Sequence, residues 1–171
     1  MNRNVTLHFF CGKMAAGKST LAKKLSDQHH AILLSEDDWL SQLYPEEIID
    51  ISGYIKYSAR LQNILSEHIQ SLLSQGVSVV LDFPGNTRDQ RNWFRNIYEQ
   101  ANVSHTLHFV DVSDDICKQQ LKERSKNMPD DAAFTSEATF DAITQYFQAP
   151  SANEGFNIIK YEQKHSLLVS K

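Results

Sequence analysis

Short apolar runs alternate with helix-forming stretches along the chain, and this alternation restricts the fold more than any other feature. The apolar runs are typical of buried β-strands and cover residues 4–11, 31–34, 77–81, 105–110 and 156–160. A stretch with helical character separates each run from the next. Strands that are always separated by helices favour an open α/β sheet, mainly parallel, with helices on both faces.

Capping residues and apolar stripes indicate the intervening helices. Helices are expected over residues 19–28, 37–44 and 53–75, and the last of these carries a continuous apolar stripe. Thr87 and Gln90 form a capping box for a fourth helix. On that helix the apolar residues are expected to face the core.

The C-terminal third combines a fifth helix, a polar loop and a last helix. Ser113 is placed to cap the fifth helix. The residues from about 125 to 138 are mostly polar and contain a proline, so a loop or short lid is expected there. The last helix is expected to end at Pro150.

The composition fits a single globular domain over residues 1–171. Cys11 and Cys117 are too few for a disulfide framework, and no apolar run approaches the ~18–20 residues of a membrane helix. We therefore expect a cytoplasmic protein without a membrane partner. The net charge of −4, from 17 basic and 21 acidic residues, speaks against a nucleic-acid partner, which usually requires a basic surface.

The loop after the first strand carries the most specific motif of the chain. It has the pattern G-x-x-x-x-G-K-S and consists of Gly12, Lys13, Met14, Ala15, Ala16, Gly17, Lys18 and Ser19, followed by Thr20. Such a loop presents backbone N–H groups to phosphate, while its lysine neutralises the β- and γ-phosphates and its serine binds Mg²⁺. The motif predicts an ATP·Mg²⁺ site. The alternative is an ordinary strand–helix turn with a surface lysine.

Acidic residues follow the second and third strands. Asp37 stands where a carboxylate can accept a proton from an attacking hydroxyl, with Asp38 as a further substrate-binding candidate. The alternative is that either residue only caps a helix. Asp82 ends an apolar strand and is expected to bind Mg²⁺, together with Ser19, or to bind substrate. The alternative for Asp82 is a turn residue.

Arginines near the expected cleft are candidates for phosphate or substrate contacts. Arg88 lies in the first turn of the fourth helix and is a substrate-binding candidate. Arg91 and Arg95 are expected on a solvated face of the same helix. Arg124 precedes the lid, where it is expected to reach the transferred phosphate or stack on adenine. The alternative for Arg124 is an arginine that satisfies helix C-terminal carbonyls.

Five segments together resemble a family of small P-loop kinases. They read GKMAAGKST, LLSEDDWL, VVLDFPGNTRDQR, HFVDVSDDICKQQLKERS and FQAPSANEGFNII. The family consists of ATP-dependent kinases often labelled AAA-type ATP-binding proteins. It is related to chloramphenicol phosphotransferase, zeta toxin and the 5′-kinase domain of polynucleotide kinases. The resemblance extends from residue 5 to about residue 161.

The resemblance implies a P-loop NTPase fold, a three-layer α/β sandwich with a five-stranded parallel sheet in the order 2-3-1-4-5. It also implies Asp37 as the catalytic base, Lys18 and Arg124 as catalytic cations, and Arg60 as a substrate-binding arginine. The segment 149–151 is expected to pass near adenine. The lid of this chain is shorter than is usual and has no second arginine.

These observations predict a phosphotransferase that moves the γ-phosphate of Mg·ATP to a hydroxyl of a small-molecule acceptor. Two alternatives stay open at this stage. The first is a nucleotide-dependent switch or slow ATPase without an acceptor, and the second is a polynucleotide 5′-kinase. The acidic charge balance speaks against the second.

Overall fold

The computed structural model describes residues 5–129, 132 and 134–163. Parts of the expected lid, residues 130, 131 and 133, lie outside this range. The elements follow in the order β1 (Thr6–Cys11), α1 (Lys18–His29), β2 (Ile32–Ser35), α2 (Glu36–Leu43), α3 (Ile51–Ser74), β3 (Val79–Asp82), α4 (Arg88–Ala101), β4 (Ser104–Val112), α5 (Asp114–Ser125), α6 (Glu137–Thr144), a 3₁₀ turn (Ala152–Glu154) and β5 (Ile158–Gln163).

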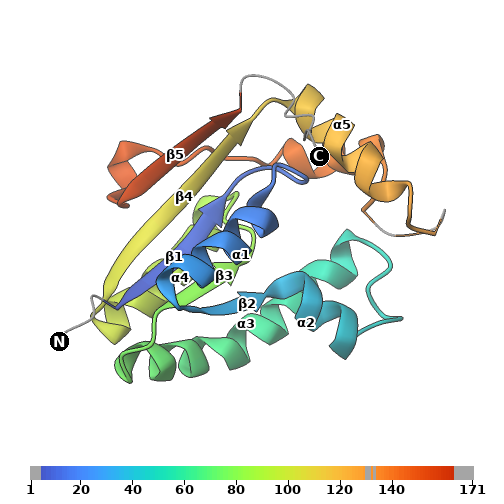
Figure 1. Ribbon diagram of the computed structural model, residues 1–171. Helices are drawn as coiled ribbons and strands as arrows, with labels where there is room; N and C mark the ends of the chain where they lie inside the picture. Colours follow the sequence, from blue (N-terminus) through green and yellow to red (C-terminus); the bar gives the residue numbers. More distant parts are fainter. Residues whose placement is uncertain (1–4, 130–131, 133, 164–171) are drawn as a thin grey trace.

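The strands form one parallel sheet in the order β2-β3-β1-β4-β5, shown in Figure 1. This confirms the expected fold class and strand order. Because all five strands run in one direction, their carboxyl ends meet at one edge of the sheet, where open α/β sheets bind their ligands. The loop from Gly12 to Gly17 and the residues following β2 and β3 lie at that edge.

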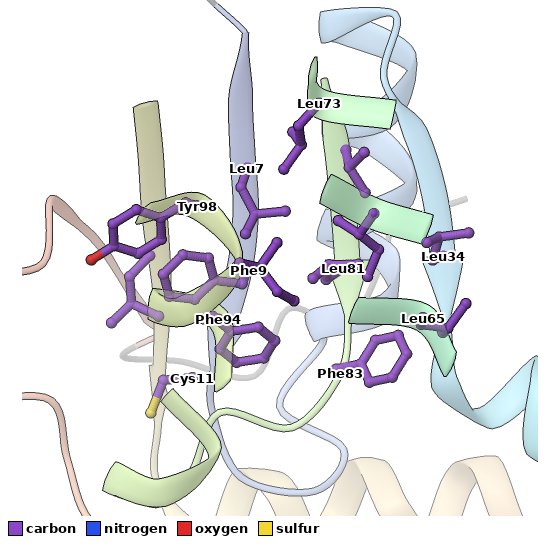
Figure 2. Close-up of a cluster of buried hydrophobic side chains, with 14 of the residues drawn as sticks. Leu7, Phe9, Cys11, Leu34, Leu65, Leu73, Leu81, Phe83, Phe94 and Tyr98 are labelled. Atoms are coloured by element: carbon purple, nitrogen blue, oxygen red, sulfur yellow. The ribbon is translucent and has the colours of Figure 1, made fainter. Parts of the chain in front are cut away.

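One face of the sheet packs against α3 and α4. Leu7 and Phe9 on β1 are fully buried on this face, and Phe94 of α4 stacks on Phe9 at 4.6 Å between ring centroids (Figure 2). The stripe from α3 contributes Leu65 and Leu73, which are almost fully buried. The apolar stripe read from the sequence is therefore the surface that fixes α3 to the sheet.

The opposite face packs against α1, α5 and α6. Phe10 and Val80 contact Leu25 of α1 on this face, while a second apolar cluster joins Val110 to Leu121 of α5. Helices on both faces of one sheet make the three-layer architecture that was expected. Within the described residues, none of the helices combines the length and apolar character needed to span a membrane.

The C-terminal part differs from expectation in two boundaries. The last helix ends at Thr144 and not at Pro150, because Phe147 instead packs against the strand residue Phe109. The following Gln148 amide donates to the carbonyl of Asn86 (2.8 Å), so this stretch crosses the sheet edge in a non-helical conformation. The last strand begins at Ile158, two residues later than expected.

Candidate active site

The loop from Gly12 to Gly17 carries the chain from β1 into α1 (Figure 1). The Ala16 N–H donates to the Lys13 carbonyl at 3.1 Å and closes a tight turn. Ala15 has a φ of 59° and Gly17 a φ of 99°, so the backbone enters the left-handed region twice. Residues that alternate between right- and left-handed conformations form a concave nest of amide groups, which suits an anion.

Helix α1 differs from the other α-helices of the described chain in its first turn. The others are capped by a side chain that accepts from a backbone amide, namely Ser35, Asp50, Thr87, Ser113 or Ser136. Helix α1 begins after Gly17, which has no side chain, and its first turn has no acidic residue. Its amides and the positive end of its dipole are therefore available to a phosphate group.

Lys18 is the first residue of α1, and its ammonium folds back onto the loop. Its Nζ donates to the carbonyl oxygens of Gly12 (2.5 Å) and Lys13 (2.9 Å). Burial lowers the pKa of this ammonium, although the nearby Asp82 and Asp37 carboxylates oppose the shift. A desolvated cation that is held only by neutral carbonyls is well prepared to bind an anionic phosphate.

Asp82 ends β3 beside Ser35, its register partner at the end of β2. Burial raises the pKa of Asp82, the nearby Ser19 hydroxyl and the charge of Lys18 oppose this, and the carboxylates of Asp37 and Asp38 raise it further. Ser19, Lys18 and the three aspartates are therefore close enough to interact at one edge of the sheet.

The donor atoms at this edge fit Mg²⁺. The Ser19 hydroxyl and the Asp82 carboxylate are hard oxygen ligands, of which Mg²⁺ typically takes one or two from the protein and the remainder from phosphate and water. In the part of the chain that the structure describes, no three His, Cys, Asp or Glu side chains gather to hold a metal by themselves. The fit is therefore to an ion that binds together with a nucleotide.

Neither Asp37 nor Asp38 caps α2. That position belongs to Ser35, whose hydroxyl accepts from the Asp38 amide, so the capping alternative for the two aspartates is wrong. Both carboxylates are exposed in the first turn of α2. The Asp37 charge acts on Lys18 as well as on Asp82, whereas that of Asp38 acts on Asp82.

Glu36 is a site residue that the sequence reasoning missed. It is only 1% exposed and accepts hydrogen bonds from the hydroxyls of Tyr54 (2.5 Å) and Ser58, both on α3. Burial raises the pKa of Glu36, and the two hydrogen bonds oppose that shift. Glu36 thereby ties the start of α2, which carries Asp37, to α3. Strand alternation was the available signal, because Glu36 lies two residues after the buried Leu34.

Arg91 contradicts the expectation of a solvated face. It is fully buried, forms a two-bond ion pair with Glu154 (2.7 and 2.9 Å), and donates to the carbonyls of Gly85 (2.9 Å) and Gln148 (2.8 Å). Arg95 is half-buried, donates to the Glu154 carbonyl at 2.6 Å and stacks on Phe156. The missed signal is that Arg91 lies three residues before Phe94 on the buried stripe of α4.

Asn86 connects the β3–α4 loop to the phosphate-binding loop, and the sequence reasoning missed it as well. Its Oδ1 accepts from the Gly12 amide at 2.8 Å. The approach depends on Gly85, since a Cβ there would lie 2.2 Å from the Phe10 carbonyl oxygen. Asn86 and Arg91 both bind Gln148, directly before the segment that is expected near adenine.

The remaining predicted arginines lie at the surface. The Arg60 guanidinium stacks on Tyr57, 5.3 Å from the ring centroid, and Arg88 is exposed in the first turn of α4. Arg124 is exposed in the last turn of α5. The roles assigned to these three side chains, and those of the loop residues and aspartates, stay predictions.

A family model described as "AAA domain" (AAA_33) matches residues 7–150. The chain belongs to this AAA-domain family. The match covers β1, the phosphate-binding loop and every element through α6. It confirms the resemblance to P-loop kinases labelled AAA-type. No curated protein matches the chain by sequence.

Solved structures similar to this AAA-domain chain include several kinases. A candidate kinase from Chloroflexus aurantiacus J-10-fl has a TM-score of 0.75 at 17% identity, covering 98% of this chain and 93% of that one. The Mycobacterium tuberculosis APS kinase in complex with AMPPNP and APS has a TM-score of 0.64 at 18% identity, covering 95% and 91%. A sugar kinase from Janibacter sp. HTCC2649 has a TM-score of 0.61 at 12% identity, covering 94% and 86%. The chain thus shares the P-loop kinase fold.

Proposed function

We propose that the protein transfers the γ-phosphoryl group of Mg·ATP to a hydroxyl group of a small-molecule acceptor. The observation that carries this proposal is the position of Asp37. Its carboxylate is exposed at the carboxyl end of β2, and its charge acts on both Lys18 and Asp82. A base open to solvent yet close to the phosphate-binding lysine can serve an acceptor that enters from outside.

The proposed roles follow from the position of each group. The amides of the loop and of α1 bind the phosphates, while Lys18 leaves its carbonyl partners to neutralise the transferred group. Ser19 and Asp82 would hold Mg²⁺, which would supply positive charge to offset that of the phosphates. Asp37 accepts the acceptor's proton, and Glu36 keeps the helix that carries Asp37 against α3.

Aromatic side chains near α2 support a compact, partly apolar acceptor. Trp39 is 39% exposed on α2, and Tyr44 stacks on Tyr57 at 4.2 Å. Tyr54 meets Phe134, a residue of the expected lid, edge to face at 5.8 Å. Aromatic surfaces with few charges suit a small organic ligand. A polynucleotide would require many phosphate contacts, whereas the chain has a net charge of −4.

The test is an acceptor screen that follows ADP release from ATP with metabolites, nucleosides and oligonucleotides. Once an acceptor stimulates release, Asp37→Asn should lower kcat by roughly 10²–10⁴-fold and leave ATP affinity nearly unchanged. Asp38→Asn is the matched control, since it removes an equal charge one residue away, and it should have a much smaller effect. A silent Asp37 change with a deleterious Asp38 change would reverse these roles.

Two outcomes of the screen separate the alternatives. Hydrolysis at the same rate with every compound would favour a switch or slow ATPase. Phosphate transfer to an oligonucleotide 5′ end, with binding that weakens steeply with salt, would favour a polynucleotide kinase.

A further inference from the structure

A cavity of about 610 Å³ lies at the opposite end of the sheet from the phosphate-binding loop. Thr6 and Ile159, which line it, stand at the beginnings of β1 and β5, and His29 is the last residue of α1. In Figure 1, α1 lies along β1, whereas α5 lies beyond the arrowheads of β4 and β5. The cavity therefore belongs to the α1 face of the sheet and is separate from the site described above.

Buried histidines give this cavity an unusual lining. His8 on β1 is 5% exposed and His108 on β4 is 1% exposed. Two residues further along these strands, on the same face, the side chains are the apolar Phe10 and Val110. His8 Nδ1 and His108 Nε2 are 3.0 Å apart, and His108 Nδ1 lies 2.9 Å from the Tyr161 hydroxyl. Three side chains from three strands thus form one hydrogen-bonded row.

The open end of this row is the second ring nitrogen of His8. His8 lines the cavity, its Nδ1 is occupied by His108, and among the described residues its Nε2 has no protein partner. The hydrogen atoms of this row can be arranged in two ways. Either Tyr161 donates to His108, which donates to His8 and leaves Nε2–H as a donor, or every bond reverses and Nε2 becomes an acceptor.

The described surroundings offer no permanently charged side chain to pair with an ionic ligand. No Lys, Arg, Asp or Glu side chain is among the described residues that line the cavity. Burial, together with the charge of His29, lowers the pKa of His8 to about 4, and burial with the charges of His8 and His29 does the same for His108. Both rings are therefore neutral at pH 7. The negative end of the α1 dipole lies at His29 and disfavours anions.

Flat surfaces and a mixed lining favour a planar occupant. The His8 ring stacks on His29 at 4.7 Å and meets the His108 ring edge to edge through their hydrogen bond, while Leu25 and Ile159 contribute apolar surface. The volume is within the range of about 300–1,000 Å³ that is typical of small-molecule sites. We propose that this cavity is a second ligand site, which binds a neutral, planar heterocycle able to donate and accept hydrogen bonds.

Benzimidazole at pH 7.5 is a suitable probe, since it is planar and carries one donor and one acceptor. Protein labelled with ¹⁵N at histidine is titrated with it, and the His8 and His108 ring nitrogens are followed by NMR. We expect a dissociation constant on the order of 1 mM, as for a good fragment. The His8 signals should move toward a single tautomer. Benzoate, an anion of similar size, should not bind.

Two variants test whether the probe occupies this cavity. His8→Phe keeps a flat ring but removes the hydrogen-bonding end, and should weaken binding at least tenfold. Ile159→Trp fills the cavity from a position that is 46% exposed, so it should fold normally and also weaken binding at least tenfold. Excess ATP should leave the probe's affinity unchanged.

Three results would overturn the proposal. The first is an absence of histidine shifts at 10 mM probe, and the second is displacement of the probe by ATP. The third is binding of Zn²⁺ but not of benzimidazole at the two histidines, which would indicate a metal site.

Discussion

Replacing Arg91 by methionine tests whether a buried ion pair holds the segment around Gln148 and Glu154 against α4. Methionine fills similar space but removes both bonds to Glu154 and the bonds to the Gly85 and Gln148 carbonyls. Removing one partner of a buried pair typically costs about 3–5 kcal/mol. The Glu154 side chain is 11% exposed and can turn partly to water, so we expect the lower end, about 3 kcal/mol.

The assay is thermal unfolding followed by near-UV circular dichroism. For a chain of this size, about 3 kcal/mol corresponds to a decrease in Tm of roughly 6–12 °C. Arg95→Met is the matched control, because Arg95 lies one turn later, is half-buried and donates one hydrogen bond to a backbone carbonyl. Its cost should be about 0.5–1.5 kcal/mol. Because Arg91 also fixes Gln148, its loss should weaken ATP binding as well.

An Arg91 variant that melts within about 2 °C of the parent protein, or no lower than Arg95→Met, would refute this reasoning. The double variant Arg91→Met/Glu154→Leu gives a further check. It removes both charges and should recover part of the lost stability, since no buried carboxylate is then left without a partner.

Three further predictions concern the loop lysine, the histidine row and the buried glutamate. Lys18→Ala should weaken ATP binding by roughly 10–150-fold, measured by calorimetry, since one charged phosphate contact is lost; unchanged affinity would contradict the nucleotide site. The pKa values of His8 and His108 are lowered to about 4, so as pH falls from about 6.5 the unfolded chain takes up protons before the folded chain does. Stability should therefore be complete above about pH 6.5 and decrease toward pH 4, by up to about 3 kcal/mol for one histidine; equal urea midpoints at pH 7.5 and 4.5 would be inconsistent with this. Glu36→Ala should speed hydrogen exchange of the α2 amides by about tenfold or more relative to α5, and equal acceleration in both helices would show that Glu36 has no local role.

The sheet and the phosphate-binding loop could be predicted because their signals are local. Each strand contains a short run of apolar or β-forming residues, and Gly17 and Lys18 occupy fixed positions between a strand and a helix. The end of the last helix was placed incorrectly because it depends on a distant partner. Phe147 leaves helical geometry to contact Phe109, which lies 38 residues earlier in the chain.

Polar residues in the interior were the main failure of the sequence reasoning. A charged side chain is usually exposed, so Arg91 and Glu36 were not taken as core residues. Each is buried because a partner from another element satisfies it, Glu154 for the arginine and Tyr54 with Ser58 for the glutamate. Such partners are 18 to 63 residues away in sequence, and no local pattern identifies them.

The most direct test of the proposed function is the fate of the γ-phosphate, followed by ³¹P NMR with Mg·ATP and the acceptor found in the screen. Transfer predicts that a phosphate-monoester signal grows in step with ADP while inorganic phosphate stays at its background level. Asp37→Asn should slow that signal much more than Asp38→Asn does. Inorganic phosphate forming at the rate of ADP production, with no ester signal for any acceptor, would contradict the account.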